Sequence, residues 1–174
     1  MQQQRAHGIA AIATKYGLIL GVVSFLIFLA QVLTGLKQNW VVSVANIALL
    51  IVLMALAHGE FRRTHSRMMT YPQGLGSGTL LASVGALIRS ILTFIYLKYI
   101  NTGYLTALVQ AQRSALAQRG ITGAQAQMAG QIAATITTPA GIAVTSLVTG
   151  VILGFVVALI VSIFTQKSDP MAVV

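Results

Sequence analysis

Few side chains in this sequence can do acid–base or metal chemistry. The chain has three histidines, two acidic residues and no cysteine. His58, Glu60 and His65 lie on or beside one short basic segment, and they are the group whose types best suit a metal ion. They lack the i, i+4 pairing of a helical metal site, and the neighbouring arginines would oppose a cation. We therefore expect no metal, no cofactor and no catalytic residue, that is, a protein that is not an enzyme.

Arg89 is the most informative charged residue, because it lies near the middle of the apolar stretch 74–100. A cation at bilayer depth costs about 2.5–3.5 kcal/mol on the more lenient insertion scale, so it usually faces acceptors, a cavity or another chain. Glu60 lies just past a different apolar stretch, and Asp169 lies in the C-terminal tail. We expect the partners of Arg89 to be neutral groups or charges of another molecule.

The elements that position these side chains are apolar helices. Hydrophobic residues make up 56% of the chain and charged residues 7%, which is typical of membrane proteins. A helix needs about 20 mostly apolar residues to cross a bilayer. We predict one all-α integral membrane domain, residues 1–174, with four transmembrane helices at residues 16–36, 40–57, 75–97 and 140–165.

The basic residues predict how these helices are oriented, because short cytoplasmic loops carry the excess of lysine and arginine. The basic residues on the side that we expect to be cytoplasmic are Arg5, Lys15, Arg62, Arg63, Arg67 and Lys167. The opposite side has fewer, and two of these lie in a long segment that translocates more freely. We expect both termini in the cytoplasm and the protein in a bacterial inner membrane.

The net charge of +9 raises the question of nucleic acid, but most of the charge flanks the spans and no basic stripe alternates with aromatic residues. Each lysine or arginine near an anionic membrane surface is worth about 1 kcal/mol. We therefore expect Arg62, Arg63 and Arg67 to lie near anionic lipid head groups, and we expect no nucleic acid partner.

Each predicted span has a face of small residues, which is how helices associate closely in lipid. Residues three or four apart share a face of a helix. The glycines that we expect at helix contacts are Gly17, Gly21, Gly78, Gly85, Gly150 and Gly154. Arg89 shares the face of the third span that carries small residues, so it is expected to point toward other helices and away from lipid.

Depth in the membrane predicts a polar cluster. At a rise of about 1.5 Å per residue, Gln31, Asn46 and Ser146 lie about 8–9 Å from the outer ends of their spans. Arg89 lies about 13 Å from its outer end and has a long side chain. We expect these four and Thr93 to form an intramembrane polar cluster. It would serve either as hydrogen-bonded glue between helices, or as a place where Arg89 binds an acid, a lipid phosphate or a transported anion.

Residues 101–138 are too polar to cross a membrane and predict a helical extracytoplasmic insert of two short helices. Thr122 followed by Gln125 has the spacing of a capping box and predicts the start of the second helix. Thr138 followed by Pro139 predicts an N-cap with proline at the first helical position, where the last span begins.

Several segments follow one another in a distinctive order. Residues 16–21 open the first span, a basic loop follows the second, residues 74–78 enter the third, residues 94–100 close it, and Pro139 enters the last. In this order the chain resembles, over nearly its whole length, a bacterial membrane family catalogued as domain of unknown function 4199. The resemblance implies a four-helix inner-membrane protein and brings no known activity. Members usually have an uncharged residue at the position of Arg89, which favours a role particular to this protein.

Two functions fit these observations. The first is a non-catalytic accessory or scaffold subunit that packs against a larger membrane complex, or against itself, through its small-residue faces. The alternative is a small oligomeric transporter or channel with an anion or lipid site near Arg89. The scarcity of titratable groups favours the first.

Overall fold

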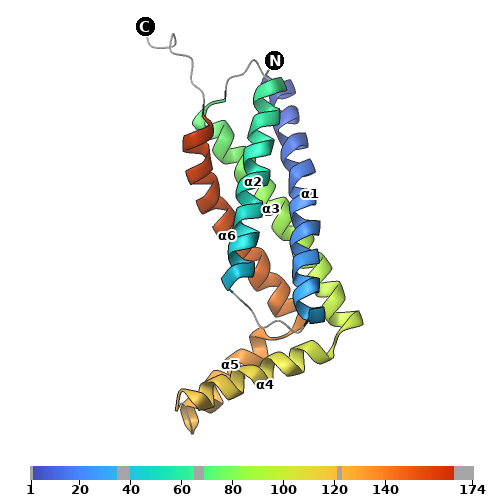
Figure 1. Cartoon of the computed structure of the whole chain (residues 1–174), viewed down its shortest axis with the longest axis vertical. Helices are drawn as coiled ribbons and strands as arrows, with labels where there is room; N and C mark the ends of the chain where they lie inside the picture. The colour runs from blue at the N-terminus through green and yellow to red at the C-terminus, as the bar shows by residue number, and fades with distance from the viewer. Residues whose placement is uncertain (1, 35–39, 65–68, 121–122, 167–174) are drawn as a thin grey trace. The chain divides into compact units, whose positions relative to one another are not determined.

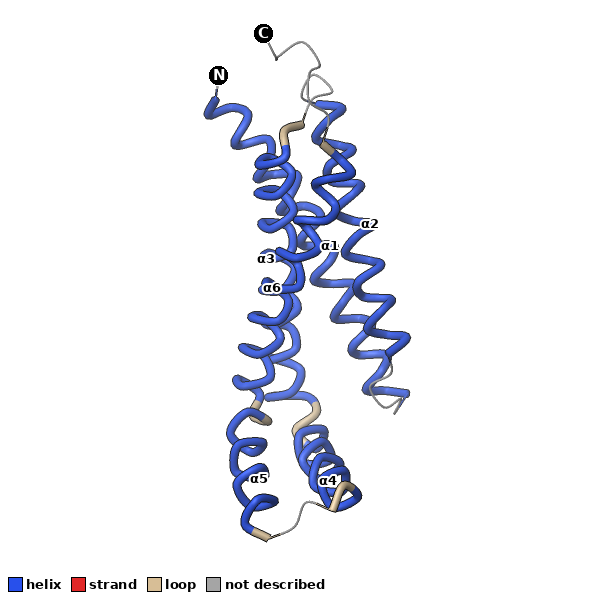
Figure 2. The backbone as a smooth tube through the Cα atoms, turned by 90° about the vertical axis from the view of Figure 1, so that its left-hand side faces the viewer, coloured by secondary structure: helices blue, strands red, loops and turns tan. Residues whose placement is uncertain are grey.

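The computed structural model describes residues 2–34, 40–64, 69–120 and 123–166, and the elements in these ranges are helices (Figures 1 and 2). This confirms the predicted all-helical class. In chain order they are α1 (Gln2–Thr34), α2 (Trp40–Thr64), α3 (Tyr71–Ile95), the π-helical turn η1 (Tyr96–Ile100), α4 (Gly103–Gln118), α5 (Ala124–Ile136) and α6 (Pro139–Thr165).

Four of these segments are long and apolar enough to cross a membrane, which confirms the predicted number of spans. They run over Gly8–Thr34, Trp40–Arg63, Tyr71–Ile100 and Pro139–Thr165. The helices that carry the first two extend beyond the apolar stretches read from the sequence, because alanine, glutamine and arginine in their flanks are good helix formers and no proline interrupts them. The four helices indicate a multi-pass membrane protein, whereas its orientation and its cellular membrane remain predictions.

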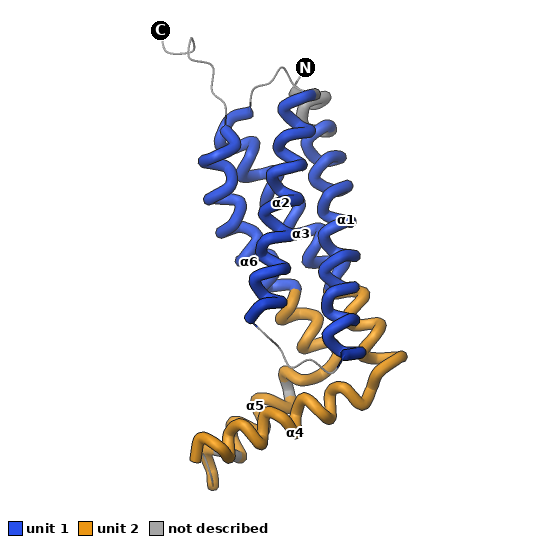
Figure 3. The backbone as a smooth tube through the Cα atoms, in the orientation of Figure 1, with its two compact units in different colours: residues 1–89, 147–174 blue, residues 90–146 orange. Residues whose placement is uncertain are grey.

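The chain divides into two compact units (Figure 3). The first comprises Met1–Arg89 and Leu147–Val174, and it contains α1, α2, most of α3 and the larger part of α6. Its apolar core includes Met54 and Leu81, both fully buried, together with Leu20, Ala82 and Ala158. The outward faces of its helices are apolar as well, as lipid-facing surfaces are.

Glycines let the helices of the first unit approach closely. A Cβ atom on Gly21 of α1 would lie 2.7 Å from Ile88 Cβ and 2.8 Å from the Gly85 carbonyl oxygen of α3. A Cβ atom on Gly150 of α6 would lie 2.8 Å from Ala86 Cβ. Because real Cβ atoms essentially never come so near, these contacts require glycine.

The other three positions expected at helix contacts show the same crowding. A Cβ on Gly17 would lie 2.8 Å from Val84 Cβ, and one on Gly78 would lie 3.0 Å from Ala158 Cβ. A Cβ on Gly154 would collide with Ala82. Together with Gly21, Gly85 and Gly150, these glycines place α3 against α1 on one side and against α6 on another.

The second unit comprises Ser90–Ser146 and contains η1, α4 and α5 with the adjoining ends of α3 and α6. The π-helical turn closes where the Asn101 amide donates to the Tyr96 carbonyl at 3.0 Å. The Asn101 side chain then accepts a hydrogen bond from the Tyr104 amide at 3.0 Å, which satisfies a donor in the first turn of α4. Ser90 donates to the Ala143 carbonyl at 2.7 Å and so ties α3 to α6.

One of the two predicted helix caps is confirmed and the other is wrong. The Gly141 amide donates to Thr138 Oγ1 at 3.0 Å, so Thr138 caps α6 and Pro139 is its first residue, as predicted. Helix α5 begins at Ala124 with Gly123 as its N-cap, in place of a capping box begun by Thr122, which lies outside the described residues. Gly123 has φ +69°, a conformation that only glycine adopts readily.

Candidate functional site

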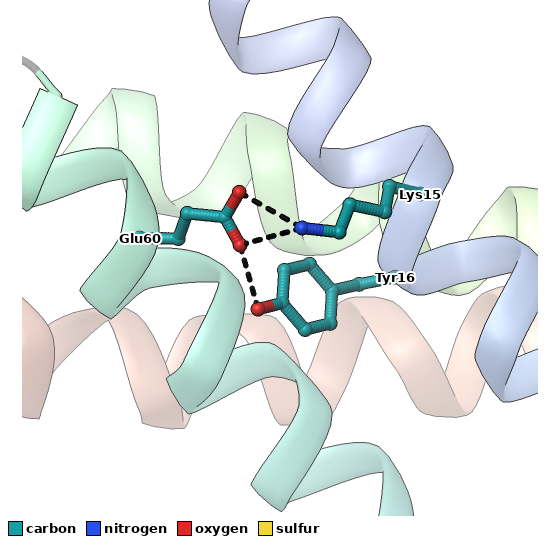
Figure 4. Close-up of polar contacts among 3 residues, drawn as sticks. All are labelled: Lys15, Tyr16 and Glu60. Atoms are coloured by element: carbon teal, nitrogen blue, oxygen red, sulfur yellow. Dashed lines mark hydrogen bonds and ion pairs between the residues drawn. The ribbon is translucent and has the colours of Figure 1, made fainter.

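Glu60 of α2 is bound by two neighbouring side chains of α1 (Figure 4). Lys15 Nζ donates to both carboxylate oxygens, at 3.0 and 3.1 Å, and the Tyr16 hydroxyl donates to Oε2 at 2.7 Å. The Lys15 and Glu60 side chains are 57% and 33% exposed, so the ion pair is partly solvated. Because α1 and α2 run antiparallel side by side, this triad fixes how one helix is aligned along the other (Figures 1 and 2).

The sequence itself contains a signal for this triad. Lys15 and Tyr16 precede the apolar part of the first span, and Glu60 follows the apolar part of the second. In an antiparallel pair of helices those two positions lie at the same membrane face. Depth counted from that membrane face therefore pairs these residues.

His58 lies fully buried two residues before Glu60, on a different face of α2. Its Nδ1 atom is 2.8 Å from Thr165 Oγ1 of α6, and its Nε2 atom is 3.1 Å from the Gly74 carbonyl oxygen of α3. One imidazole ring therefore joins three helices of the first unit. The apolar stretch at residues 40–57 ends just before His58, but α2 continues through it.

Three hydroxyl side chains lie at or beside the groups that His58 contacts. Ser77 Oγ donates to the Gly74 carbonyl at 3.0 Å, and Thr165 Oγ1 is 2.8 Å from the Val161 carbonyl of its own helix. Ser162 is fully buried, and its hydroxyl has no hydrogen-bond partner among the described residues. We call His58, Gly74, Ser77, Ser162 and Thr165 the His58 site.

Of the three residues considered as metal ligands, the two that the structure describes contact different helices. His58 faces α3 and α6, Glu60 is bound by α1, and His65 lies outside the described residues. Within the described ranges no three His, Cys, Asp or Glu side chains are grouped so that they could hold a metal ion.

Arg89 is half-buried on α3, at the boundary of the first unit. Within the described part of the chain, its guanidinium makes no hydrogen bond or ion pair. The acid in that part, Glu60, is bound by Lys15 and Tyr16. Asp169 lies outside the described residues.

Two of the other members expected in the polar cluster bond within their own helices. Asn46 Nδ2 donates to the carbonyl four residues earlier in α2 at 3.0 Å, and Ser146 Oγ donates to the carbonyl three residues earlier in α6 at 2.8 Å. Asn46 Oδ1 and Thr93 Oγ1 are buried without a hydrogen-bond partner among the described residues. Gln31 is half-buried on α1. The assembly of these residues with Arg89 into one cluster stays a prediction.

The arginines expected near lipid head groups begin at the last turn of α2. Arg62 is half-buried and Arg63 is exposed. Both lie at the C-terminal end of α2, where the negative end of the helix dipole stabilises a cation. Arg67 lies outside the described residues. Their contact with lipid stays a prediction.

Comparison with known proteins supplies a family and no activity. The family model described as "Protein of unknown function (DUF4199)" matches residues 15–167, which confirms the resemblance seen in the sequence. No curated protein and no solved structure matches the chain.

Proposed function

Because the chain belongs to the DUF4199 family of proteins of unknown function, we propose its role from its own side chains. It is a non-catalytic accessory or scaffold subunit of a membrane, packing against a larger membrane complex or against a second copy of itself. Its membrane is the bacterial inner membrane, with both termini in the cytoplasm and the insert between α3 and α6 outside.

The state of Arg89 is the observation that carries this proposal. A charged side chain within a span is costly unless it is paired, hydrogen-bonded or hydrated. The described residues offer Arg89 no such partner, and Glu60 is already engaged by Lys15. A carboxylate or phosphate of another molecule satisfies the guanidinium with charge-assisted, bidentate hydrogen bonds.

The outer surfaces of the spans support the same proposal. Large apolar residues are exposed along α1, α2 and α6, including Leu26 (53%), Val52 (54%) and Ile152 (60%). Such surfaces suit lipid or the helices of a partner. The buried imidazole of His58 is engaged by contacts between the helices of this chain.

Native mass spectrometry of the protein in mild detergent tests the proposal. The wild type is expected to retain a stoichiometric membrane partner or a second copy, and Arg89→Gln is expected to lose it. Lys98→Gln is the matched control, because Lys98 is an exposed cation on the same stretch of helix and lies over the Phe94 and Tyr99 rings. A wild type that is a clean monomer, or an Arg89→Gln protein that keeps its partner, contradicts the proposal.

The alternative, a small oligomeric transporter or channel, uses as its anion site the same guanidinium, to which the described residues offer no partner. Its test is anion flux into proteoliposomes that contain the purified protein. Flux that is lost in Arg89→Gln and kept in Lys98→Gln supports the transporter and displaces the scaffold. If vesicles with the wild type, vesicles with either variant and empty vesicles all leak anions equally, the transporter hypothesis is contradicted.

Lipid head groups are the second partner class that we propose. Arg62, Arg63 and Arg67 interact with anionic lipids at the cytoplasmic face, where each contributes about 1 kcal/mol. Replacing all three by glutamine is expected to reduce the number of anionic lipids that co-purify. A neutral triple variant that retains as many as the wild type refutes this assignment.

A further inference from the structure

The two ring nitrogens of His58 face groups of different hydrogen-bonding capacity. Nε2 lies 3.1 Å from the Gly74 carbonyl oxygen, which only accepts, so Nε2 carries a hydrogen and donates it. A neutral imidazole has one N–H group. In the neutral ring Nδ1 is therefore an acceptor, and it takes its hydrogen bond from the Thr165 hydroxyl at 2.8 Å.

The Thr165 hydroxyl has a second acceptor within the same reach. Its Oγ1 atom lies 2.8 Å from the Val161 carbonyl oxygen as well as 2.8 Å from Nδ1. A hydroxyl has one hydrogen, so it donates to one of these two at a time. While it donates to His58, the Val161 carbonyl keeps only its backbone hydrogen bonding.

We propose that His58 is a proton-binding site in which the Thr165 hydroxyl is the switch. A proton from hydronium binds the lone pair of Nδ1, forming one N–H bond and leaving water. The Thr165 hydroxyl rotates away, accepts from Nδ1–H and donates its own hydrogen to Val161. The ring then donates from both nitrogens, and the site has gained one positive charge with its heavy atoms in place.

The groups that face the ring determine how well its positive charge is stabilised. Helix α3 presents the Gly74 carbonyl and α6 presents Thr165, neither of which titrates. On α2 itself, Glu60 faces α1, where Lys15 and Tyr16 bind it, and Arg62 lies one turn beyond His58. Among the described residues no carboxylate therefore contacts the ring, and the added charge rests on oxygen acceptors alone.

The buried Ser162 hydroxyl is a second observation that points to this site. It has no hydrogen-bond partner among the described residues, and a Cβ atom on Gly74 would lie 3.0 Å from its oxygen. Among the described residues the Ser162 hydroxyl is therefore an unused polar group beside Gly74, the residue whose carbonyl oxygen lies 3.1 Å from Nε2 of His58. Since His58 joins α2 to α3 and α6, proton binding changes the hydrogen bonding at the point where these three helices meet.

Nitrogen-15 NMR of histidine-labelled protein in nanodiscs tests the proposal. A variant with His7 and His65 changed to glutamine reports His58 alone. At neutral pH we expect Nε2 to be protonated and Nδ1 to be unprotonated, and on acidification we expect Nδ1 to gain the proton. A neutral ring with its hydrogen on Nδ1, or a ring that does not titrate before the protein unfolds, overturns the proposal.

Thr165→Val then isolates the switch, since valine keeps the shape and removes the hydroxyl. Hydrogen bonds to charged groups are stronger than neutral ones, so we expect proton binding to weaken about tenfold. Thr79→Val is the matched control, because the Thr79 hydroxyl donates to the Leu75 carbonyl of its own helix and makes no hydrogen bond to His58. Thr165→Ser keeps the hydroxyl and is expected to titrate like the wild type. If the valine variant does not fold, the titration of the serine variant still tests the proposal. If the valine and serine variants titrate at the same pH, whether both match the wild type or both bind the proton more weakly, the role of the Thr165 hydroxyl is contradicted.

Discussion

Lys15 and Glu60 are 45 residues apart in the chain, and their side chains meet at 3.0 Å between α1 and α2. The pair bears directly on Arg89, because Glu60 is the one acidic residue in the part of the chain that the structure describes. With that carboxylate held by Lys15 and Tyr16, the cation within α3 has no acidic partner in the part of the chain that the structure describes.

The coupling between Lys15 and Glu60 is measurable by a double-mutant cycle. We expect Lys15→Gln and Glu60→Gln each to lower the thermal stability slightly, and the double variant to lose less than their sum. The coupling is expected to shrink as salt rises, since both side chains reach solvent. Strictly additive losses at low salt argue against the pair.

Gly21 is expected to tolerate no side chain. In Gly21→Ala the new Cβ meets Ile88 Cβ at 2.7 Å and a backbone carbonyl of α3 at 2.8 Å, so the helices must separate. We expect a loss of about 1–3 kcal/mol of unfolding free energy, measured by steric trapping or by denaturation in detergent.

Gly76→Ala is the control for that variant, because no atom of the described residues lies within 4 Å of a Cβ at Gly76 in α3. Alanine is the better helix former by up to about 1 kcal/mol, so this variant is expected to be neutral or more stable. Similar effects of the two substitutions argue against the close approach of α1 to α3.

Met54 is fully buried in the core of the first unit, and Met54→Ala is expected to cost about 2–5 kcal/mol of unfolding free energy. Ile152, 60% exposed on α6, is the comparison, and Ile152→Ala is expected to change stability by no more than about 0.5 kcal/mol. Thermal unfolding of both variants in the same nanodiscs gives the ranking. The reverse order refutes the packing of this unit.

Gly123 is expected to be required where α5 begins. Its φ of +69° and ψ of −142° lie in a region open essentially to glycine, so Gly123→Ala is expected to cost about 1–3 kcal/mol locally. Hydrogen exchange of the α5 amides reports this as faster opening. Gly130→Ala, inside α5 with open space around it, is expected to slow exchange. Unchanged exchange at Gly123→Ala excludes that backbone conformation.

Composition and spacing were sufficient for the helices and insufficient for the sites. The four spans follow from apolar length, and the Thr138 cap follows from its residue type next to Pro139. The site at His58 does not follow from the apolar criterion, because the apolar stretch ends at Ala57, whereas the helix continues through the residues that follow.

Contacts between distant segments do not follow from the composition or spacing of either segment. Lys15 and Glu60 meet because two helices are antiparallel, a relationship that neither helix carries in its own sequence. The capping pattern at Thr122 predicts an earlier start for α5 than the structure has, because the backbone conformation that glycine permits at Gly123 decides where the helix begins.

The thermal stability of Arg89→Met in the purified single chain, in nanodiscs of neutral lipid, tests the central claim most directly. Methionine keeps much of the length of arginine and removes its charge. If the counter-charge of Arg89 belongs to another molecule, the isolated variant is expected to be as stable as the wild type or more stable, because an unpaired charge has left the span. A marked loss of stability in the isolated chain would mean that Arg89 is bound by groups of this chain, and would contradict the proposed partner.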